Sequence, residues 1–119
     1  MDNQEFKVVI ENRLIDFAVS IIEIVRKLPN DQAGNHLGNQ LLRSGTSPGL
    51  NYGEALAAES RKDFIHKIGI VLKELRESMI CLKILQRIGY VKDEPVLDEC
   101  NQLISIFVKT VNTTKAKMQ

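Results

Sequence analysis

Polar side chains recur at steps of three and four residues between positions 40 and 54, the spacing that places them along one flank of a helix. The stripe consists of Gln40, Arg43, Ser44, Ser47, Asn51 and Glu54. One interpretation is a polar binding groove at a helix or subunit boundary. The other is a packing seam, in which charges pair with neighbouring helices and hydroxyls satisfy backbone groups. Glu74 and Glu77 are the expected partners of Arg43 and favour the seam.

These residue types do not assemble a recognised catalytic or metal-binding pattern. General acid–base catalysis by two carboxylates requires acids that converge from different elements, whereas Glu74 and Glu77 lie on consecutive turns. A di-metal carboxylate bundle requires Glu-x-x-His pairs, and neither His36 nor His66 follows a glutamate by three residues. We therefore expect no catalytic residue, cofactor or metal. An unfamiliar enzyme that uses the polar stripe is a third hypothesis.

The glycine-containing segments GNHLGNQLL and GTSPGLNYG could be mistaken for phosphate-binding loops. Neither ends in the Gly-Lys-Ser/Thr sequence that holds phosphates and a metal, and no strand precedes them. Their composition argues against nucleotide binding.

A second set of candidates is basic and lies in the following segment. The possible nucleic-acid contacts are Arg61, Lys62, Lys67, Lys73 and Arg76. Carboxylates interleave with them, so a solvated face with ion pairs along the helix is the favoured alternative. The chain as a whole has 16 basic and 15 acidic side chains, too balanced for the strong positive field that dominates nucleic-acid binding. Any basic surface must be local.

Apolar residues at alternating steps of three and four predict the elements that position these side chains. The expected helices span about residues 3–28, 32–57, 61–88 and 95–113. Short links between them favour an antiparallel up-and-down four-helix bundle. We predict an all-α protein with a single domain over residues 1–119.

The second of these helices conflicts with helix propensity. It contains five of the seven glycines and Pro48, and an interior glycine costs a helix about 1 kcal/mol and an interior proline about 3 kcal/mol. A structureless run of this length inside a compact domain is itself improbable. The apolar and small residues also keep the helical rhythm. We predict a helix that is kinked or interrupted near Ser47 and Pro48, with small residues that let a neighbouring backbone approach.

Other apolar residues bear on assembly and environment. Ile70, Ile80 and Ile84 fall away from the main apolar stripe and are candidates for an intermolecular surface. Cys81 and Cys100 lie in apolar helical patterns without ligand spacing, which is typical of buried free thiols in a reducing compartment. The amino terminus lacks the pattern of a signal peptide, and no apolar stretch is long enough to span a membrane. We expect a cytoplasmic protein without a membrane partner.

The segment from Gln40 to Leu75 resembles the bacterial four-helix-bundle family named after proteins encoded within intervening sequences of 23S rRNA genes. The matching residues are Gln40, Arg43, Ser44, Thr46, Ser47, Asn51, Glu54, Ser60, Phe64 and Ile65. The resemblance implies a closed homo-oligomer, typically a pentamer, without known enzymatic activity. The chain is also similar in build to the accessory variability protein of diversity-generating retroelements, a basic pentamer that engages nucleic acid and a reverse transcriptase.

Two functions therefore remain open. The leading hypothesis is a non-catalytic homo-oligomeric adaptor or scaffold that presents surfaces arranged in a ring to a protein or nucleic-acid partner. The alternative is an RNA- or DNA-binding accessory protein that uses basic surface gathered by the oligomer, because repetition makes a modest patch multivalent.

Overall fold

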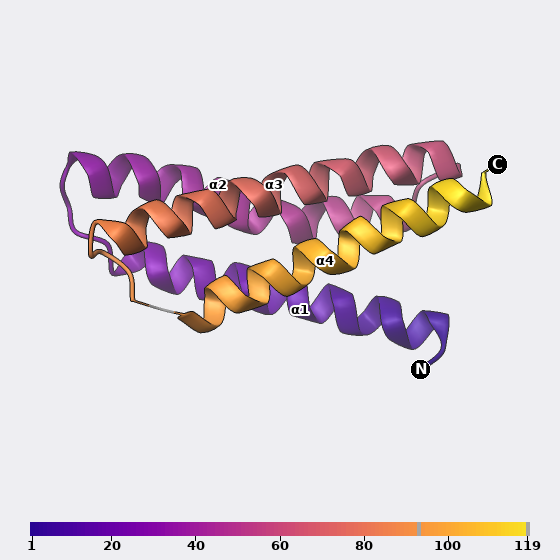
Figure 1. Cartoon of the computed structure of the whole chain (residues 1–119), viewed down its shortest axis with the longest axis horizontal. Helices are drawn as coiled ribbons and strands as arrows, with labels where there is room; N and C mark the ends of the chain where they lie inside the picture. Colours follow the sequence, from indigo (N-terminus) through magenta and orange to yellow (C-terminus); the bar gives the residue numbers. More distant parts are fainter. Residues whose placement is uncertain (93, 119) are drawn as a thin grey trace.

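Four helices run alternately up and down a molecule of 49 × 25 × 20 Å (Figure 1). The structure, a computed structural model, describes residues 1–92 and 94–118. The helices are α1 (Asn3–Arg26), α2 (Gln32–Leu56), α3 (Arg61–Arg87) and α4 (Glu94–Lys117). This arrangement confirms the predicted all-α four-helix bundle.

Short polar side chains fix where the first three helices begin. Asp2, Asp31 and Ser60 each accept a hydrogen bond from the backbone N–H three residues further on, at 2.8, 2.7 and 3.0 Å. These contacts satisfy N–H groups that have no partner within the helix. Gly89, just after α3, has a φ of 83°, a left-handed conformation that glycine adopts readily and that ends a helix.

The second helix is continuous through Pro48, so it is not interrupted there. Pro48 is buried and has no N–H to donate to the Ser44 carbonyl, and close packing offsets this local cost. A Cβ added to Gly45 would lie 2.6 Å from Cγ2 of Ile21, and one added to Gly38 would lie 3.2 Å from Cδ1 of Leu28. Gly45 therefore lets α1 approach the backbone of α2, and Gly38 makes room for Leu28 just after α1.

The fourth helix continues to Lys117, four residues beyond the predicted end at residue 113. Thr110 and Thr114 each donate a side-chain hydrogen bond to the carbonyl four residues earlier, at 2.9 and 2.8 Å. Arg61 at the start of α3 donates to the Lys117 carbonyl at 3.0 Å. The polar tail therefore continues α4, and its end is tied to a neighbouring helix.

The core lies along the bundle axis and is mostly aliphatic. Leu14, Ile21, Leu41, Leu75 and Leu103 are completely buried. Two aromatic rings, Tyr52 and Phe107, meet edge to face with centroids 5.5 Å apart. Such a core holds the helices in fixed orientations and so determines which side chains face outward.

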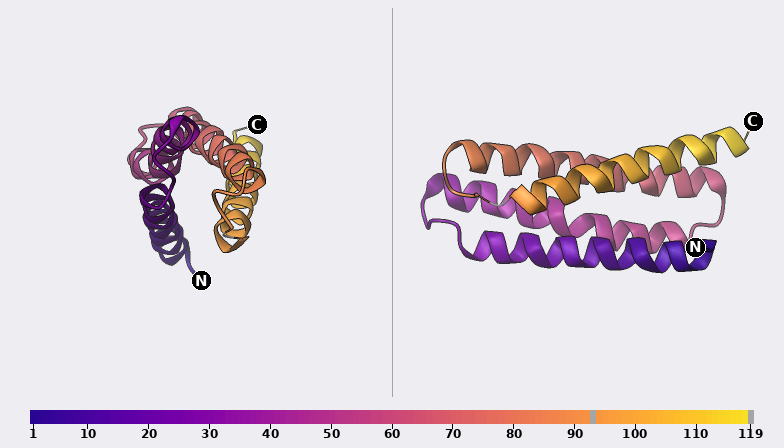
Figure 2. Two further views of the ribbon diagram at one scale, coloured as in Figure 1. Left: turned by 90° about the vertical axis from the view of Figure 1, so that its left-hand side faces the viewer. Right: turned by 60° about the horizontal axis from the view of Figure 1, so that its bottom comes forward.

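The four helices do not pack equally around the bundle. Packing is closest between α2 and α3 and loosest between α1 and α4, and α1 and α3 share no backbone contact among the described residues. Viewed end on, the helices form an arch with α1 and α4 as its two legs (Figure 2). Arg13 on α1 joins these legs through Glu99 on α4, with Nη2 2.5 Å from Oε1.

Candidate functional site

The predicted polar stripe lies at the contact between α2 and α3. Arg43 Nη1 donates to Glu74 Oε2 at 2.7 Å, and its Nη2 donates to Glu77. Glu74 is buried, whereas Arg43 and Glu77 reach the surface. The hydrogen bond and charge of Glu74, with a smaller contribution from Glu77, raise the pKa of Arg43. The structure thus brings together Arg43 and the two glutamates expected to pair with it.

Two serine hydroxyls lie deeper in the same contact. Ser78 donates to Ser44 Oγ at 2.8 Å, and both side chains are completely buried. Ser78 was not among the predicted site residues. The signal was present, since Ser78 lies four residues after Glu74 and therefore on the same side of α3.

The remaining stripe residues do not converge on one point. Asn51 donates to Ser47 Oγ at 2.8 Å and to the Ser47 carbonyl at 3.0 Å, so both lie within one turn of α2. Glu54 accepts from Lys67 Nζ at 3.2 Å, and Gln40 is exposed. Among the described residues, the stripe therefore presents no nucleophile and base placed to act together.

The five predicted basic contacts divide into two groups. Arg61 donates to the Lys117 carbonyl and Lys67 pairs with Glu54, so both are engaged within the fold. The other three share the exposed side of α3 with two basic residues that were not among the predicted contacts. Together they form the α3 basic face: Lys62, Lys73, Arg76, Lys83 and Arg87.

The α3 basic face is not neutralised by its own helix. Glu74 and Glu77 turn toward Arg43 on α2, so they do not form the expected ion pairs along α3. Among residues 1–92 and 95–118, no salt bridge involves a residue of the α3 basic face. Lys83 and Arg87 continue the spacing of three and four residues, a signal from which they could have been predicted.

The outward side of α1 is mainly acidic. Its exposed carboxylates and the aliphatic side chains between them form the α1 acidic face: Glu5, Asp16 and Glu23, with Val8, Ile15 and Val19. The three aliphatic side chains are 50, 47 and 48% exposed. Arg26 follows Glu23 at the end of the helix. No salt bridge within the described part of the chain involves the three carboxylates. The near-zero net charge of the whole sequence hides this separation of charge.

Aliphatic side chains are also exposed on α3. Ile80 and Ile84, two of the three residues predicted to lie off the core, are 58 and 43% exposed. The third, Ile70, is half-buried. Ile88 extends the exposed row and is 46% exposed. This aliphatic row adjoins the α3 basic face.

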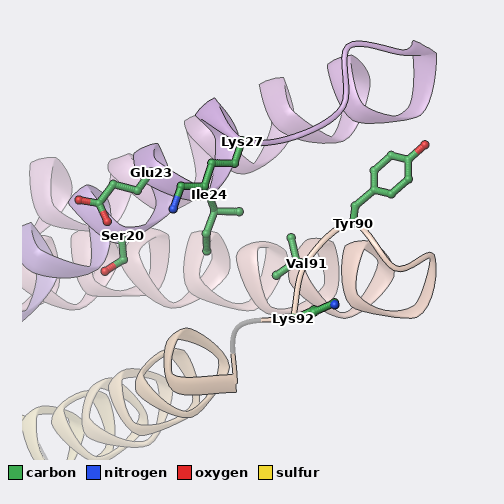
Figure 3. Close-up of a pocket in the computed structure, with 7 residues that line it drawn as sticks. All are labelled: Ser20, Glu23, Ile24, Lys27, Tyr90, Val91 and Lys92. Carbon is green, nitrogen blue, oxygen red and sulfur yellow. The ribbon is translucent and has the colours of Figure 1, made fainter.

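A hollow of about 370 Å³ lies between the end of α1 and the link that follows α3 (Figure 3). Glu23 lines it from α1, Lys27 from the residue just after α1, and Lys92 from the link. The Tyr90 hydroxyl points away from it and donates to Asp31, the residue that caps α2. The hollow has charges of both signs, so its lining selects no particular ligand class.

The described residues also contain neither a metal-binding cluster nor a membrane-spanning helix. No group of three His, Cys, Asp or Glu side chains there is arranged to hold a metal ion. In the same part of the chain, no helix has the length and apolar character needed to cross a bilayer.

These features define an antiparallel four-helix-bundle protein whose polar residues lie mainly at helix contacts and on charged outer faces. The family model described as 23S rRNA-intervening sequence protein matches residues 7–112. The chain belongs to this family. A crystal structure of a protein of unknown function from the S23 ribosomal protein family of Bacteroides thetaiotaomicron is similar to it, with 33% identity and a TM-score of 0.82. The similarity covers 89% of this chain and 97% of that one. No curated protein matches the chain.

Proposed function

We propose that the chain is a non-catalytic homo-oligomeric adaptor or scaffold whose subunits join through the α1 acidic face of one copy and the α3 basic face of the next. One observation carries the proposal: two complementary charged faces, each with exposed aliphatic side chains, lie on helices whose backbones do not contact each other. The charged groups of each face lack a salt-bridge partner among the described residues of their own chain.

The signs of the charges favour a head-to-tail arrangement. Two copies that met through the same face would place like charges opposite each other, which costs several kcal/mol in an interface. A contact between unlike faces avoids this cost and repeats from subunit to subunit, so it closes into a ring or extends as a filament. The family resemblance favours a ring of five.

The exposed aliphatic residues would supply the apolar centre of this contact. The α3 row of Ile80, Ile84 and Ile88 would pack against the aliphatic side chains of the α1 acidic face, with the charges around them. Stable interfaces commonly combine an apolar centre with a polar rim. The rim charges would fix which faces meet, while apolar burial would supply much of the affinity.

Light scattering at micromolar concentration tests the assembly. A mass several times the 13.4 kDa of one chain is expected. The double variants Arg76→Glu/Lys83→Glu and Asp16→Lys/Glu23→Lys should each shift the protein toward the monomer. A chain that carries all four substitutions should reassemble, because every interface is again complementary.

The matched control is Lys92→Glu/Lys115→Glu, which reverses two exposed lysines that belong to neither face and should leave the mass unchanged. A monomeric wild-type protein would remove the proposal. Failure of the fourfold variant to reassemble, with its helical circular dichroism intact, would remove the assignment of the two faces.

The α3 basic face also supports a second candidate function, binding of RNA or DNA. Its five cations extend from Lys62 to Arg87, about 38 Å at 1.5 Å per residue. Cations arranged along such a length can follow phosphates and release their counterions. An oligomer would repeat the face and raise its avidity.

Binding of a fluorescent mixed-sequence RNA at about 50 and about 200 mM salt separates the two candidates. If the α3 basic face binds nucleic acid, Arg76→Glu/Lys83→Glu weakens RNA binding and Asp16→Lys/Glu23→Lys does not. If the face serves assembly alone, both double variants alter the mass and RNA is not bound. Absence of binding at low salt, or binding without salt dependence, excludes this candidate.

A further inference from the structure

An open groove lies between α1 and α4 near the amino-terminal end of α1. The two helices form separate legs of the arch (Figure 2), and the groove between them has a volume of about 540 Å³. Phe6 and Ile10 line it from α1, and Phe107 lines it from α4. Tyr52 of α2 and Phe64 of α3 also contribute to the lining. All four helices therefore form a largely apolar groove.

The charged side chains that line the groove are all lysines. Lys7 belongs to α1, and Lys109 and Lys117 belong to α4. No carboxylate lines the groove among the described residues. The apolar lining and cationic edges are complementary to a partner that is itself both apolar and anionic.

A tyrosine hydroxyl provides a second, independent observation. Tyr52 is only 4% exposed and lines the groove, yet its hydroxyl has no hydrogen-bond partner among the described residues. In that part of the chain, every side-chain polar atom sealed from solvent has a partner, so this hydroxyl keeps some access to solvent. Burial, and to a smaller extent the charge of Glu11, raise the pKa of Tyr52. Polar groups this deep normally have a partner, and this one is available to a bound molecule.

The lysines are spread along the groove. Lys109 and Lys117 are eight residues apart on α4, which corresponds to about 12 Å along the helix. A single-chain lipid has one anionic head and would require the cations at one end. An amphipathic helix presents carboxylates on successive turns and matches the observed spread.

We propose that this groove binds an acidic amphipathic helix of a partner protein. The apolar side of that helix packs against Phe6, Tyr52 and Phe64, and carboxylates on its flanks pair with the lysines. Recognition follows the helix-in-groove mode, in which apolar side chains at positions i, i+3, i+4 and i+7 anchor the ligand. The proposal goes beyond self-association, because the groove-lining residues belong to neither the α1 acidic face nor the α3 basic face.

The test uses the full chain and a synthetic amphipathic peptide of three to four helical turns, with leucines at i, i+3, i+4 and i+7 and glutamates on the flanks. A matched peptide has lysine in place of every glutamate. Fluorescence anisotropy should show saturable binding of the acidic peptide, with a Kd at least about tenfold lower than that of the basic peptide. Raising the salt concentration should weaken this binding.

Variants locate the site. Lys109→Glu/Lys117→Glu should weaken binding of the acidic peptide at least about tenfold, and Phe6→Ser should weaken it through the apolar contact. Phe6 is 39% exposed, which favours folding of that variant. The matched control Lys73→Glu/Lys83→Glu removes two cations from α3 and should leave peptide binding unchanged, whatever it does to the oligomeric mass.

Several results would overturn the proposal: no binding of the acidic peptide, equal binding of both peptides, or binding insensitive to the groove variants. Saturable binding of oleate without binding of the peptide would assign the groove to a lipid. A fall in the oligomeric mass of Lys109→Glu/Lys117→Glu, together with no binding of the peptide, would assign it to a second copy. Peptide binding and oligomeric mass are measured separately, and the control Lys73→Glu/Lys83→Glu changes α3 alone. Failure of the groove proposal is therefore distinguishable from failure of the proposed assembly.

Discussion

The hydroxyl of Ser78 on α3 donates a hydrogen bond to the hydroxyl of Ser44 on α2 at 2.8 Å, inside a contact from which water is excluded. Immediately outside this pair, Arg43 binds Glu74. The α2–α3 contact therefore changes from an ion pair near the surface to a hydroxyl pair in the interior. Such directional bonds fix the axial position of one helix against the other, which apolar packing alone specifies less sharply.

The two serines should depend on each other energetically. Ser44→Ala and Ser78→Ala are each expected to lower the free energy of unfolding by about 1–2 kcal/mol, because each removes the bond between the two buried hydroxyls. The cost of Ser78→Ala should be the smaller one, because Ser44 keeps its own bond to the Leu41 carbonyl at 3.4 Å. The double variant should cost less than the sum of the two. Urea denaturation at a fixed protein concentration measures all three. Strict additivity would show that the hydroxyls do not interact.

Stability should depend on pH through Asp31 and Tyr90. The hydrogen bond from Tyr90, and then that from the Gly34 N–H, lower the pKa of Asp31 below its ordinary value of 3.8. A lowered carboxyl pKa gives stability that is present above the unfolded value and lost as the pH falls through the folded value. The same hydrogen bond raises the pKa of Tyr90 above 10.0, so its contribution is present below pH 10.0 and lost as the pH rises through the folded value.

Tyr90→Phe removes this bond while keeping the ring. The urea midpoint of the variant should lie below that of the wild-type protein by a constant amount between about pH 5 and 9. The difference should shrink toward more acidic and more alkaline pH. A difference of the same size at every pH would show that the bond does not couple to either titration.

Glycines on α2 should respond to alanine in opposite ways. A Cβ added to Gly53 meets nothing within 4 Å, so Gly53→Ala should stabilise the helix by up to about 1 kcal/mol. A Cβ added to Gly45 would overlap Ile21, so Gly45→Ala should destabilise by about 1–3 kcal/mol. The two urea midpoints should move in opposite directions. A midpoint for Gly45→Ala at or above wild type would contradict the close approach of α1 and α2.

The two thiols should react slowly in the folded protein. Burial, and to a smaller extent the charge of Glu99, raise the pKa of Cys100 to about 12, and its Sγ donates to the Leu75 carbonyl at 3.3 Å. At pH 8 only about one thiol in ten thousand is then the reactive thiolate. Ellman's reagent should modify Cys100 in a Cys81→Ser variant only after unfolding with urea. Rapid reaction of the folded variant would contradict this burial.

Patterns within short stretches of sequence were sufficient to predict much of the fold. Apolar spacing predicted the bundle and the approximate range of each helix, because amphipathic stripes are properties of a few consecutive turns. The pairing of Arg43 with Glu74 also followed from spacing, once α2 and α3 were taken as neighbours. By contrast, residue types alone left open whether the chain is interrupted at Pro48. The unbroken helix depends on packing against α1.

The sequence by itself determined the helical class and the positions along each helix that are polar, because these depend on local periodicity. Tertiary structure decided which charges remain exposed without a salt bridge in the described part of the chain. Glu74 and Glu77 turn toward Arg43, which leaves Lys73 and Arg76 on the α3 basic face without them. The tertiary structure also decided that α1 and α4 leave a groove between them whose charged lining residues are lysines. Both outcomes depend on the direction in which each helix faces its neighbours, and that direction is set by packing between residues far apart in the chain.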